Sequence, residues 1–399
     1  CELVDFWRFN VHFMSQLYAE QPQSSPGIWN RLEHRPLDGF VLAITPFNFT
    51  SIAGNLPTAP AMLGNTALWK PSSTSILSNH YLMKLLEEAG LPPGVVNFIP
   101  GSGPVVGDMC MSDRRLGGVH FTGSTGVFQT IWRTVGENLG HYAQYPRLVG
   151  ETGGKDFVLA LPDSEPQALA VALVRGAFEF QGQKCSAASR AYVPKSLWND
   201  VKDRMAAMID DIKMGDITDF HNFVGAVIDA KAFKKHRDAI EGTKRDSTAK
   251  VVLGGHTDDS EGYFVQPTVI EVADPRHDLM RTELFGPILT VYVYDDARVE
   301  ETLELCATTS EYALTGAIFG RDRIGLRRAM EALRFAAGNF YINDKPTGAV
   351  VGQQPFGGSR ASGTNDKAGS ILNLTRWISA RSIKETFVPP KDYRYPFME

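Results

Sequence analysis

Apolar and polar positions along this chain switch repeatedly between a helical and an extended period. The opening run CELVDFWRFNVHFMSQLY has apolar residues at the spacing of an amphipathic helix. Apolar runs of strand length, such as GFVLAIT and LGGVHF, then alternate with longer helical stretches such as SSTSILSNHYLMKLLEEAG. Strands that alternate with helices are typical of βαβ units, so the pattern predicts an α/β protein whose parallel sheet is covered by helices on both faces.

A second alternating block begins at KDFVLALPD and continues through ALAVALVRGAFEFQG, SRAYVPKSLW, GYFVQPTVIEV, FGPILTVYVYDD and TGAIFGR. This block has strands and helices of its own, and 399 residues exceed the usual size of one domain. We therefore predict a second α/β domain. Two strand-like pieces flank the turn region Pro36–Gly39, and the end of the chain, Trp377–Glu399, has the extended, proline-bearing character of an arm.

Composition argues against several classes of partner. Lys plus Arg total 40 against 45 Asp plus Glu, and the net charge of -5 disfavours nucleic acid or an anionic membrane. No apolar stretch reaches the roughly 20 residues of a membrane-spanning helix. The four cysteines form no CxxC pair, so we predict neither a disulfide framework nor a metal site. The chain begins with Cys1 rather than Met, and we expect a shortened or processed N-terminus.

The stretch FEFQGQKCSAASR places one cysteine, Cys185, among glycine and small polar residues. A buried structural cysteine is normally flanked by hydrophobic residues. Here Gly182, Lys184 and Ser186 suit close backbone approach and partial exposure instead. Cys185 is therefore a candidate reactive thiol.

Two further stretches carry candidate groups for chemistry. Asn48 follows an apolar strand in ITPFNFTSIAGN, where its amide suits donation to a developing oxyanion or, the commoner role for an isolated asparagine, the cap of the following helix. Glu151 precedes two glycines in GETGGKDF. A lone glutamate is usually solvated surface, but one beside a Gly-Gly turn between apolar segments can serve as a general base.

Two glycine-rich stretches are candidates for binding a dinucleotide. FTGSTGV runs from a strand into a helix, so the backbone N–H groups near Gly123 can face a phosphate, although the stretch fits a plain strand-to-helix turn equally well. In GSGPVVGD the glycines miss the GxGxxG spacing, and the stretch is more typical of a turn that starts a helix.

Taken in series, these stretches resemble the aldehyde dehydrogenase superfamily over nearly the whole chain. The order of Asn48, Gly123, Glu151, Cys185 and the Glu283 of TELFGP is that of the family. The motifs ITPFNFT, FTGSTGVF, ETGGKDF, GQKCSAASR, FGPILTVYVY and VVGQQPFGGSRASGTNDKAG resemble, more narrowly, the L-glutamate γ-semialdehyde (1-pyrroline-5-carboxylate) dehydrogenases. Agreement of six motifs in order is not expected by chance.

The resemblance implies NAD-dependent oxidation of L-glutamate γ-semialdehyde to L-glutamate, a reaction of proline catabolism. Cys185, with a lowered thiol pKa, would attack the aldehyde, and Asn48 together with the Cys185 backbone N–H would hold the oxyanion. Hydride would pass to the nicotinamide, and Glu151 would activate water to release the acid. Two alternatives stay open: another acidic-aldehyde dehydrogenase, such as one for succinate semialdehyde, and a catalytically silent member of the superfamily.

The resemblance also implies which residues bind the cofactor and the substrate. Cofactor contacts are expected from Thr45, Lys70, Gly123, Ser124, Thr125, Gly126, Val127, Glu283 and Phe285, with Lys70 and Glu283 on the two riboses. Many NAD-preferring relatives have a glutamate where this chain has Ser73, so NAD is favoured while NADP stays open. Ser186, Gly348 and Ala349 would bind the substrate's far carboxylate, and Phe49 and Phe356 would clamp its stem; Ala349 replaces a serine common in the family.

The implied fold has three parts. We expect a modified Rossmann NAD-binding domain at residues 1–21 and 42–150, a catalytic domain at 151–376, and a small β oligomerisation arm made of a hairpin at 22–41 and the tail 377–399. The family's N-terminal part is expected to be missing. A homo-oligomer, dimeric or larger, is expected, located in the mitochondrial matrix of a eukaryote or otherwise in the cytoplasm.

Overall fold

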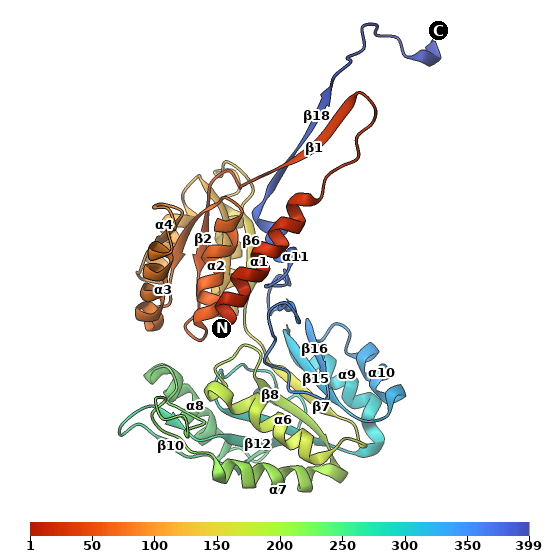
Figure 1. Cartoon of the computed structure of the whole chain (residues 1–399). Helices are drawn as coiled ribbons and strands as arrows, with labels where there is room; N and C mark the ends of the chain where they lie inside the picture. The colour runs from red at the N-terminus through yellow and green to blue at the C-terminus, as the bar shows by residue number, and fades with distance from the viewer. Residues whose placement is uncertain (399) are drawn as a thin grey trace. The chain divides into compact units, whose positions relative to one another are not determined.

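The computed structural model describes residues 1–398, which divide into two compact units (Figure 1). Unit 1 contains Cys1–His120, Arg133–Leu148 and Ala368–Glu399, and unit 2 contains Phe121–Trp132 and Val149–Lys367. The chain therefore passes between the units four times. The domain boundary expected after residue 150 lies beside one of these passages, while the roles assigned to each part stay predictions.

Unit 1 is built on a five-stranded sheet of order β4-β3-β2-β5-β6. Its strands are β2 (Phe40–Ile44), β3 (Thr66–Lys70), β4 (Val96–Phe98), β5 (Leu116–Thr122) and β6 (Arg147–Glu151). β2 is parallel to β3, and β3 to β4. The middle of β2 is fully buried, as expected for an apolar run in a sheet covered on both faces.

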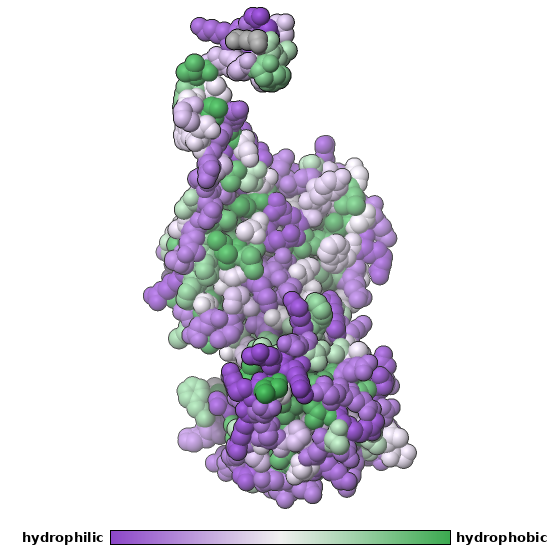
Figure 2. All heavy atoms as spheres, turned by 90° about the vertical axis from the view of Figure 1, so that its right-hand side faces the viewer, coloured by the Kyte–Doolittle hydropathy of each residue, from purple (hydrophilic) through white to green (hydrophobic). Residues whose placement is uncertain are grey.

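Helices cover both faces of this sheet, which confirms the α/β prediction (Figure 1). α3 (Ile76–Glu88) and α4 (Gly103–Met111) lie on one side, and α1 (Glu2–Ala19) and α2 (Thr50–Met62) on the other. α2 is buried from Ala53 to Pro60 although it contains two prolines. α1 exposes Val4, Val11 and Tyr18, and hydrophobic residues are visible on the surface of this unit in Figure 2. None of the helices within residues 1–398 is long and apolar enough to span a membrane.

The hairpin expected at residues 22–41 is wrong. β1 (Ile28–Arg35) pairs antiparallel with β18 (Ser379–Thr386), from Ile28 opposite Thr386 to Arg35 opposite Ser379, whereas β2 joins the five-stranded sheet. The difference follows from polarity, because β2 is apolar enough for a covered sheet and the sequence IWNRLEHR of β1 suits an exposed ribbon. Cross-strand ion pairs, such as Arg31 with Glu385 at 2.9 Å, add to this pairing.

Unit 2 is built on a seven-stranded sheet of order β16-β15-β7-β8-β13-β12-β9. Its strands are β7 (Asp156–Ala160), β8 (Ala188–Pro194), β9 (Ala249–Leu253), β12 (Thr268–Val272), β13 (Ile288–Tyr294), β15 (Thr315–Phe319) and β16 (Asn339–Ile342). Neighbouring strands are parallel except β9, which runs antiparallel to β12. The second α/β block expected from the sequence is thus present.

Side chains alternate between the two faces of the seven-stranded sheet. Phe157 and Leu159 of β7 join a core with α8 (Ala230–Thr243), α9 (Val299–Thr309) and α10 (Arg323–Ala332). Val158 and Ala160 join a second core with α6 (Pro166–Phe178) and α7 (Lys195–Asp211). Both faces are therefore covered, so we expect a binding site in the loops at the strand ends.

Candidate active site

Cys185 lies in unit 2, between the short helix Glu179–Gly182 and β8. The backbone at residues 180–182 is left-handed, with φ of 54°, 57° and 62°. A Cβ at Gly182 would lie 2.3 Å from the carbonyl oxygen of Gly286, so glycine is required there. This turn carries the chain off α6 and leaves Cys185 partly exposed, as the small polar residues around it predict.

The electrostatic surroundings of Cys185 differ from the expectation of a lowered thiol pKa. Withdrawal from water raises the pKa of the thiol, and the carboxylates of Asp156, Glu151 and Glu283 raise it further. Negative neighbours disfavour the thiolate. The thiol is therefore protonated at neutral pH and needs a proton acceptor when it attacks.

Glu151 ends β6 and lies against the glycine pair of QQPFGG. Its Oε2 accepts a hydrogen bond of 3.4 Å from the N–H of Gly358, and a Cβ at Gly357 would lie 2.9 Å from its Oε1. Withdrawal from water raises the Glu151 pKa well above its usual value, while the Gly358 N–H and the ammonium of Lys367 act in the opposite direction. A carboxyl group with a raised pKa is a stronger base near neutral pH.

The two glycines of ETGG allow two other segments to approach this turn. The N–H of Gly154 donates to Oε1 of Glu283 at 2.9 Å, and a Cβ at Gly153 would lie 2.5 Å from Oε2 of that carboxylate. A Cβ at Gly154 would lie 2.2 Å from the carbonyl oxygen of Cys185. The turn after Glu151 therefore contacts both the loop of the thiol and the carboxylate expected to bind a ribose.

The GSTG turn also lies beside Glu151. The N–H of Gly123 donates to the Glu151 carbonyl oxygen at 3.2 Å, and the N–H of Gly153 donates to the hydroxyl of Thr125 at 3.2 Å. α5 (Thr125–Glu137) starts at this turn, with Ser124, Gly126 and Val127 exposed at its beginning. Phe285, two residues after Glu283, has a left-handed φ of 59°. Four sequence-predicted segments therefore meet within unit 2.

The candidates in unit 1 lie at the carboxyl ends of its strands. The N–H of Thr45, after β2, donates to the carbonyl oxygen of Lys70, the last residue of β3, at 3.1 Å. Ligands of open parallel sheets bind outside this end of the strands. Asn48 is buried, and it precedes the N-cap residue Phe49 of α2, so Asn48 is not the cap that its isolated motif suggests. The binding and catalytic roles of these residues stay predictions.

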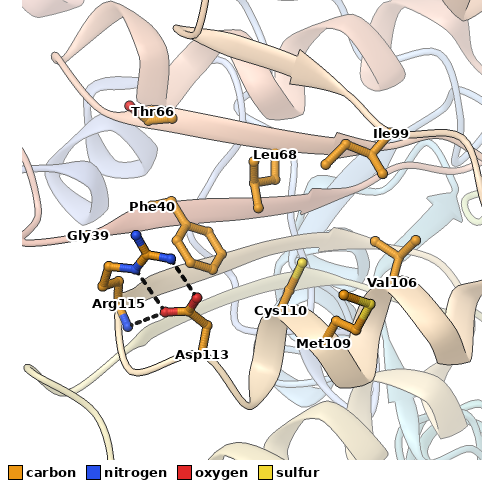
Figure 3. A pocket seen from close by; sticks show the side chains of 10 residues that line it. All are labelled: Gly39, Phe40, Thr66, Leu68, Ile99, Val106, Met109, Cys110, Asp113 and Arg115. Atoms are coloured by element: carbon orange, nitrogen blue, oxygen red, sulfur yellow. Dashed lines mark hydrogen bonds and ion pairs between the residues drawn. The ribbon is translucent and has the colours of Figure 1, made fainter.

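A pocket of about 560 Å³ in unit 1 lies at the other ends of β2 and β3 (Figure 3). Gly39, Phe40 and Thr66 line it at the starts of these strands, and Asp113 and Arg115 form an ion pair of 2.8 Å within the lining. It contains none of the candidate site residues. The neighbouring GSGPVVGD stretch starts α4 with Ser102 as its N-cap, which confirms the interpretation as a helix start.

Two parts of the expected substrate anchor lie side by side in unit 2. The hydroxyl of Ser186, next to the thiol, is hydrogen-bonded to that of Thr347 at 2.8 Å. Thr347 directly precedes Gly348, which is exposed with a φ of 92°, and Ala349. The side chain of Phe356 is partly exposed farther along the same segment.

Sequence reasoning missed a group of cations near this anchor. The carboxylate of Glu179 binds Lys184 at 3.0 Å and Arg175 at 3.1 Å, and Lys345 lies 3.9 Å away. A Cβ at Gly348 would lie 3.1 Å from Nζ of Lys345. The position of Lys184 beside the cysteine was a usable signal, whereas the approach of Lys345 depends on the tertiary fold.

Sequence reasoning also missed two buried charged residues near Cys185, which are Lys155 and Asp156. Lys155 is 1% exposed, its Nζ has no hydrogen-bond partner within residues 1–398, and withdrawal from water lowers its pKa to about 7. Burial also raises the pKa of the neighbouring Asp156 well above its usual value. The usable signal was the pair of charged residues at the head of the apolar strand KDFVLAL, since charges are rarely buried without a role.

Comparisons with known proteins agree on one family. A model of the aldehyde dehydrogenase family matches residues 1–383. The mitochondrial delta-1-pyrroline-5-carboxylate dehydrogenase of Dictyostelium discoideum is 54% identical over 400 residues, covering 100% of this chain and 72% of that protein. The Bos taurus enzyme of the same name is 49% identical, covering 100% and 71%. The Mycobacterium tuberculosis delta-pyrroline-5-carboxylate dehydrogenase structure bound with NAD has a TM-score of 0.95 at 59% identity, covering 100% and 73%.

Proposed function

The chain belongs to the aldehyde dehydrogenase family, and from this premise we propose that it oxidises L-glutamate γ-semialdehyde, the open form of 1-pyrroline-5-carboxylate, to L-glutamate in proline catabolism. The observation that carries the proposal is the meeting of Cys185, Glu151 and Glu283 around one glycine turn. The curated relatives above are named as delta-1-pyrroline-5-carboxylate dehydrogenases, which favours this substrate over succinate semialdehyde and disfavours a silent member.

The residues fit NAD as the hydride acceptor. The exposed start of α5 offers backbone N–H groups to a phosphate, and Glu283 offers a carboxylate for ribose hydroxyls beside the thiol. Lys70, a cation at the carboxyl end of β3, suits the other ribose. When bound, NAD accepts the hydride that the substrate carbon loses.

The first step is addition of Cys185 Sγ to the aldehyde carbon. The thiol proton passes to solvent, and Glu151 serves as the base of the second step, where its raised pKa favours proton uptake. Negative charge then develops on the substrate oxygen, where we assign donation to the Asn48 amide and the Cys185 backbone N–H. Loss of hydride from the same carbon leaves a thioester on Cys185.

The second step is hydrolysis of that thioester. Glu151 accepts a proton from water, and the hydroxide adds to the thioester carbon. The carbon–sulfur bond then breaks to release the product acid and the Cys185 thiolate, which takes up the proton held by Glu151. The Gly358 N–H orients the Glu151 carboxylate for this purpose. A single carboxyl group thus serves as the base of this step, and the mechanism uses no histidine.

Charge around the anchor supports a substrate with an acidic far end. Three cations, Arg175, Lys184 and Lys345, lie within 3.9 Å of the Glu179 carboxylate, and the Nζ of Lys345 also lies near Gly348. A carboxylate bound by the N–H groups of Gly348 and Ala349 and by the Ser186 hydroxyl would be stabilised there. We assign Phe49 and Phe356 to the apolar stem between the two ends.

Assembly and location follow the same family. We propose a homo-oligomer, dimeric or larger, with the exposed β1–β18 ribbon as its arm. Curated eukaryotic relatives are named mitochondrial, so the proposed location in a eukaryote is the mitochondrial matrix.

The test is NADH formation by the purified protein with glutamate semialdehyde, with succinate semialdehyde and without aldehyde. We expect the highest kcat/KM with glutamate semialdehyde. A higher kcat/KM with succinate semialdehyde would support the alternative that the protein is another acidic-aldehyde dehydrogenase. Absence of NADH together with absence of a covalent adduct at Cys185 would support a silent member.

A further inference from the structure

We propose that Lys367 is a positioning residue for Glu151: it holds the Gly357–Gly358 turn against the carboxyl group and supplies the positive charge that favours the ionised base. The inference rests on the proposed role of Glu151 as base. Lys367 is the lysine of the TNDK segment, and the family resemblance seen in the sequence gives it no role.

The ammonium of Lys367 lies among acceptors from two segments of the chain. Nζ donates to the carbonyl oxygen of Gly338 at 2.8 Å, to that of Gly357 at 3.0 Å, and more weakly to Oδ1 of Asn339 at 3.4 Å. The N–H of Gly357 in turn donates to the same Asn339 oxygen at 3.1 Å. Lys367 therefore fastens the glycine pair to the start of β16.

The glycine pair occupies the space between the ammonium and the base. Gly357 gives its carbonyl oxygen to Lys367, while a Cβ on it would lie 2.9 Å from Oε1 of Glu151. Gly358 donates its N–H to Oε2 at 3.4 Å. A shift of this turn would change the orientation of the carboxyl group, so the anchoring of the turn bears directly on catalysis.

The backbone around Lys367 is held in an uncommon conformation. Asn365 and Lys367 are both left-handed, each with a φ of 55°, a region that non-glycine residues seldom adopt. Nearby, Gly150 and Thr364 exchange two hydrogen bonds of 2.9 Å, which fix the segment beside Glu151. Strained backbone that persists next to reacting groups is typical of preorganised sites.

The charges that act on Glu151 come from several segments. Lys367 lowers the Glu151 pKa, Asp366 raises it, and the Cys185 thiol interacts with the same carboxyl group. Withdrawal from water is the largest influence and raises the pKa. Removing Lys367 should therefore raise the Glu151 pKa further, so that the base is ionised only at higher pH.

Three substitutions separate charge from structural support. Lys367→Met removes the charge and the donors, Lys367→Gln keeps donors without charge, and Lys367→Arg keeps the charge. The readout is steady-state NADH formation with glutamate semialdehyde from about pH 6 to about pH 10, together with the NADH burst of the first turnover. We expect the acid limb of kcat to move to higher pH in the Met and Gln variants and to stay in place in the Arg variant.

At neutral pH the Met variant should keep its burst and lose about tenfold in steady-state rate, a part of the roughly 10²- to 10⁴-fold that a general base contributes. The rate should recover at alkaline pH. Lys250→Met, at an exposed position of β9, is the matched control and should leave the pH profile unchanged. An acid limb that stays in place in both the Met and the Gln variants would overturn the inference.

Asp366→Asn supplies an independent test of opposite sign. Asp366 raises the Glu151 pKa, so this near-isosteric change should move the acid limb to lower pH, even if the Lys367 variants fold poorly. An unmoved or oppositely moved limb counts against electrostatic coupling in this segment. Glu151→Gln tests the proposed base separately from Lys367. Retained turnover in that variant would refute the role of Glu151 as base, whatever the Lys367 variants show.

Discussion

Two thiols of unit 2 differ in a way that shows what makes a cysteine available for chemistry. Cys306 lies on α9 with 0% exposure, in the core beside Leu303 and Leu326. Cys185 lies on a left-handed turn, is partly exposed and has carboxyl groups around it. Withdrawal from water raises the pKa of both thiols, that of Cys306 to about 12.

In this protein, a cation beside a thiol therefore does not identify the reactive cysteine. The guanidinium of Arg190 donates to the Cys306 carbonyl oxygen at 3.2 Å and acts to lower the pKa of that thiol, yet Cys306 is closed to any substrate. Cys185 has negative neighbours but is partly exposed and lies near Glu151, the proposed base. Exposure and a nearby carboxyl group, rather than the resting pKa, distinguish the proposed nucleophile from the structural thiol.

The largest expected effect comes from replacing each thiol in turn, which tests whether Cys185 rather than Cys306 is the nucleophile. Cys185→Ala should abolish aldehyde oxidation and leave NAD binding measurable by calorimetric titration, because the nucleotide contacts that we propose lie on other segments. Cys306→Ala should keep the activity and cost about 1 to 2 kcal/mol of unfolding free energy, through loss of a buried sulfur. More than trace NADH formation by the Cys185 variant would contradict the mechanism.

The proton acceptor near Cys185 can be tested separately from the thiol. Glu151→Gln should form the thioester, with one equivalent of NADH in a burst, and then lose about 10²- to 10⁴-fold in steady-state rate because water is no longer activated. Stopped-flow absorbance at the NADH band measures both phases. A uniform slowdown without a burst would assign Glu151 to the first proton transfer alone.

The residue after the nucleophile gives a finer test of the accessible loop. A hydrogen bond to a charged group contributes about 1.5 to 3 kcal/mol, so Ser186→Ala should lower kcat/KM for glutamate semialdehyde roughly ten- to a hundredfold. An aldehyde of similar length without a carboxylate should lose much less. Equal losses would mean that Ser186 supports the cysteine loop through its bond to Thr347 rather than contacting the substrate.

The smallest effect concerns the negative charge that raises the Cys185 pKa. Asp156 is the charged group with the largest influence on this thiol, so Asp156→Asn should lower its titration midpoint. The rate of alkylation of Cys185 by iodoacetamide, followed against pH by mass spectrometry, should then rise at lower pH than in the unchanged protein. Cys306 serves as the internal control and should remain unmodified in both proteins. An unchanged midpoint would remove Asp156 from the electrostatics of the thiol.

The sequence could predict those features that depend on residues close to one another along the chain. The runs that form β2 and β7, the glycine turns beside Glu151 and the small residues around Cys185 each carry their signal within a few neighbours. Three other features depend on residues brought together from separate segments: the pairing of β1 with β18, the contact of the Lys367 ammonium with Gly338, and the carboxyl groups near the thiol. Such contacts leave no local pattern, and the thiol pKa depends on all of them.

The division of unit 1 into three segments has a consequence for biosynthesis. Its last segment contains Trp377, which is 0% exposed, lies 4.8 Å from the His120 ring and accepts a hydrogen bond of 2.8 Å from Asn65 through its carbonyl oxygen. A ribosome makes Asn65 early and Trp377 near the end. Unit 2, complete at Lys367, is thus the first to have all its residues, and the unit that begins the chain waits for the final segment before its core can close.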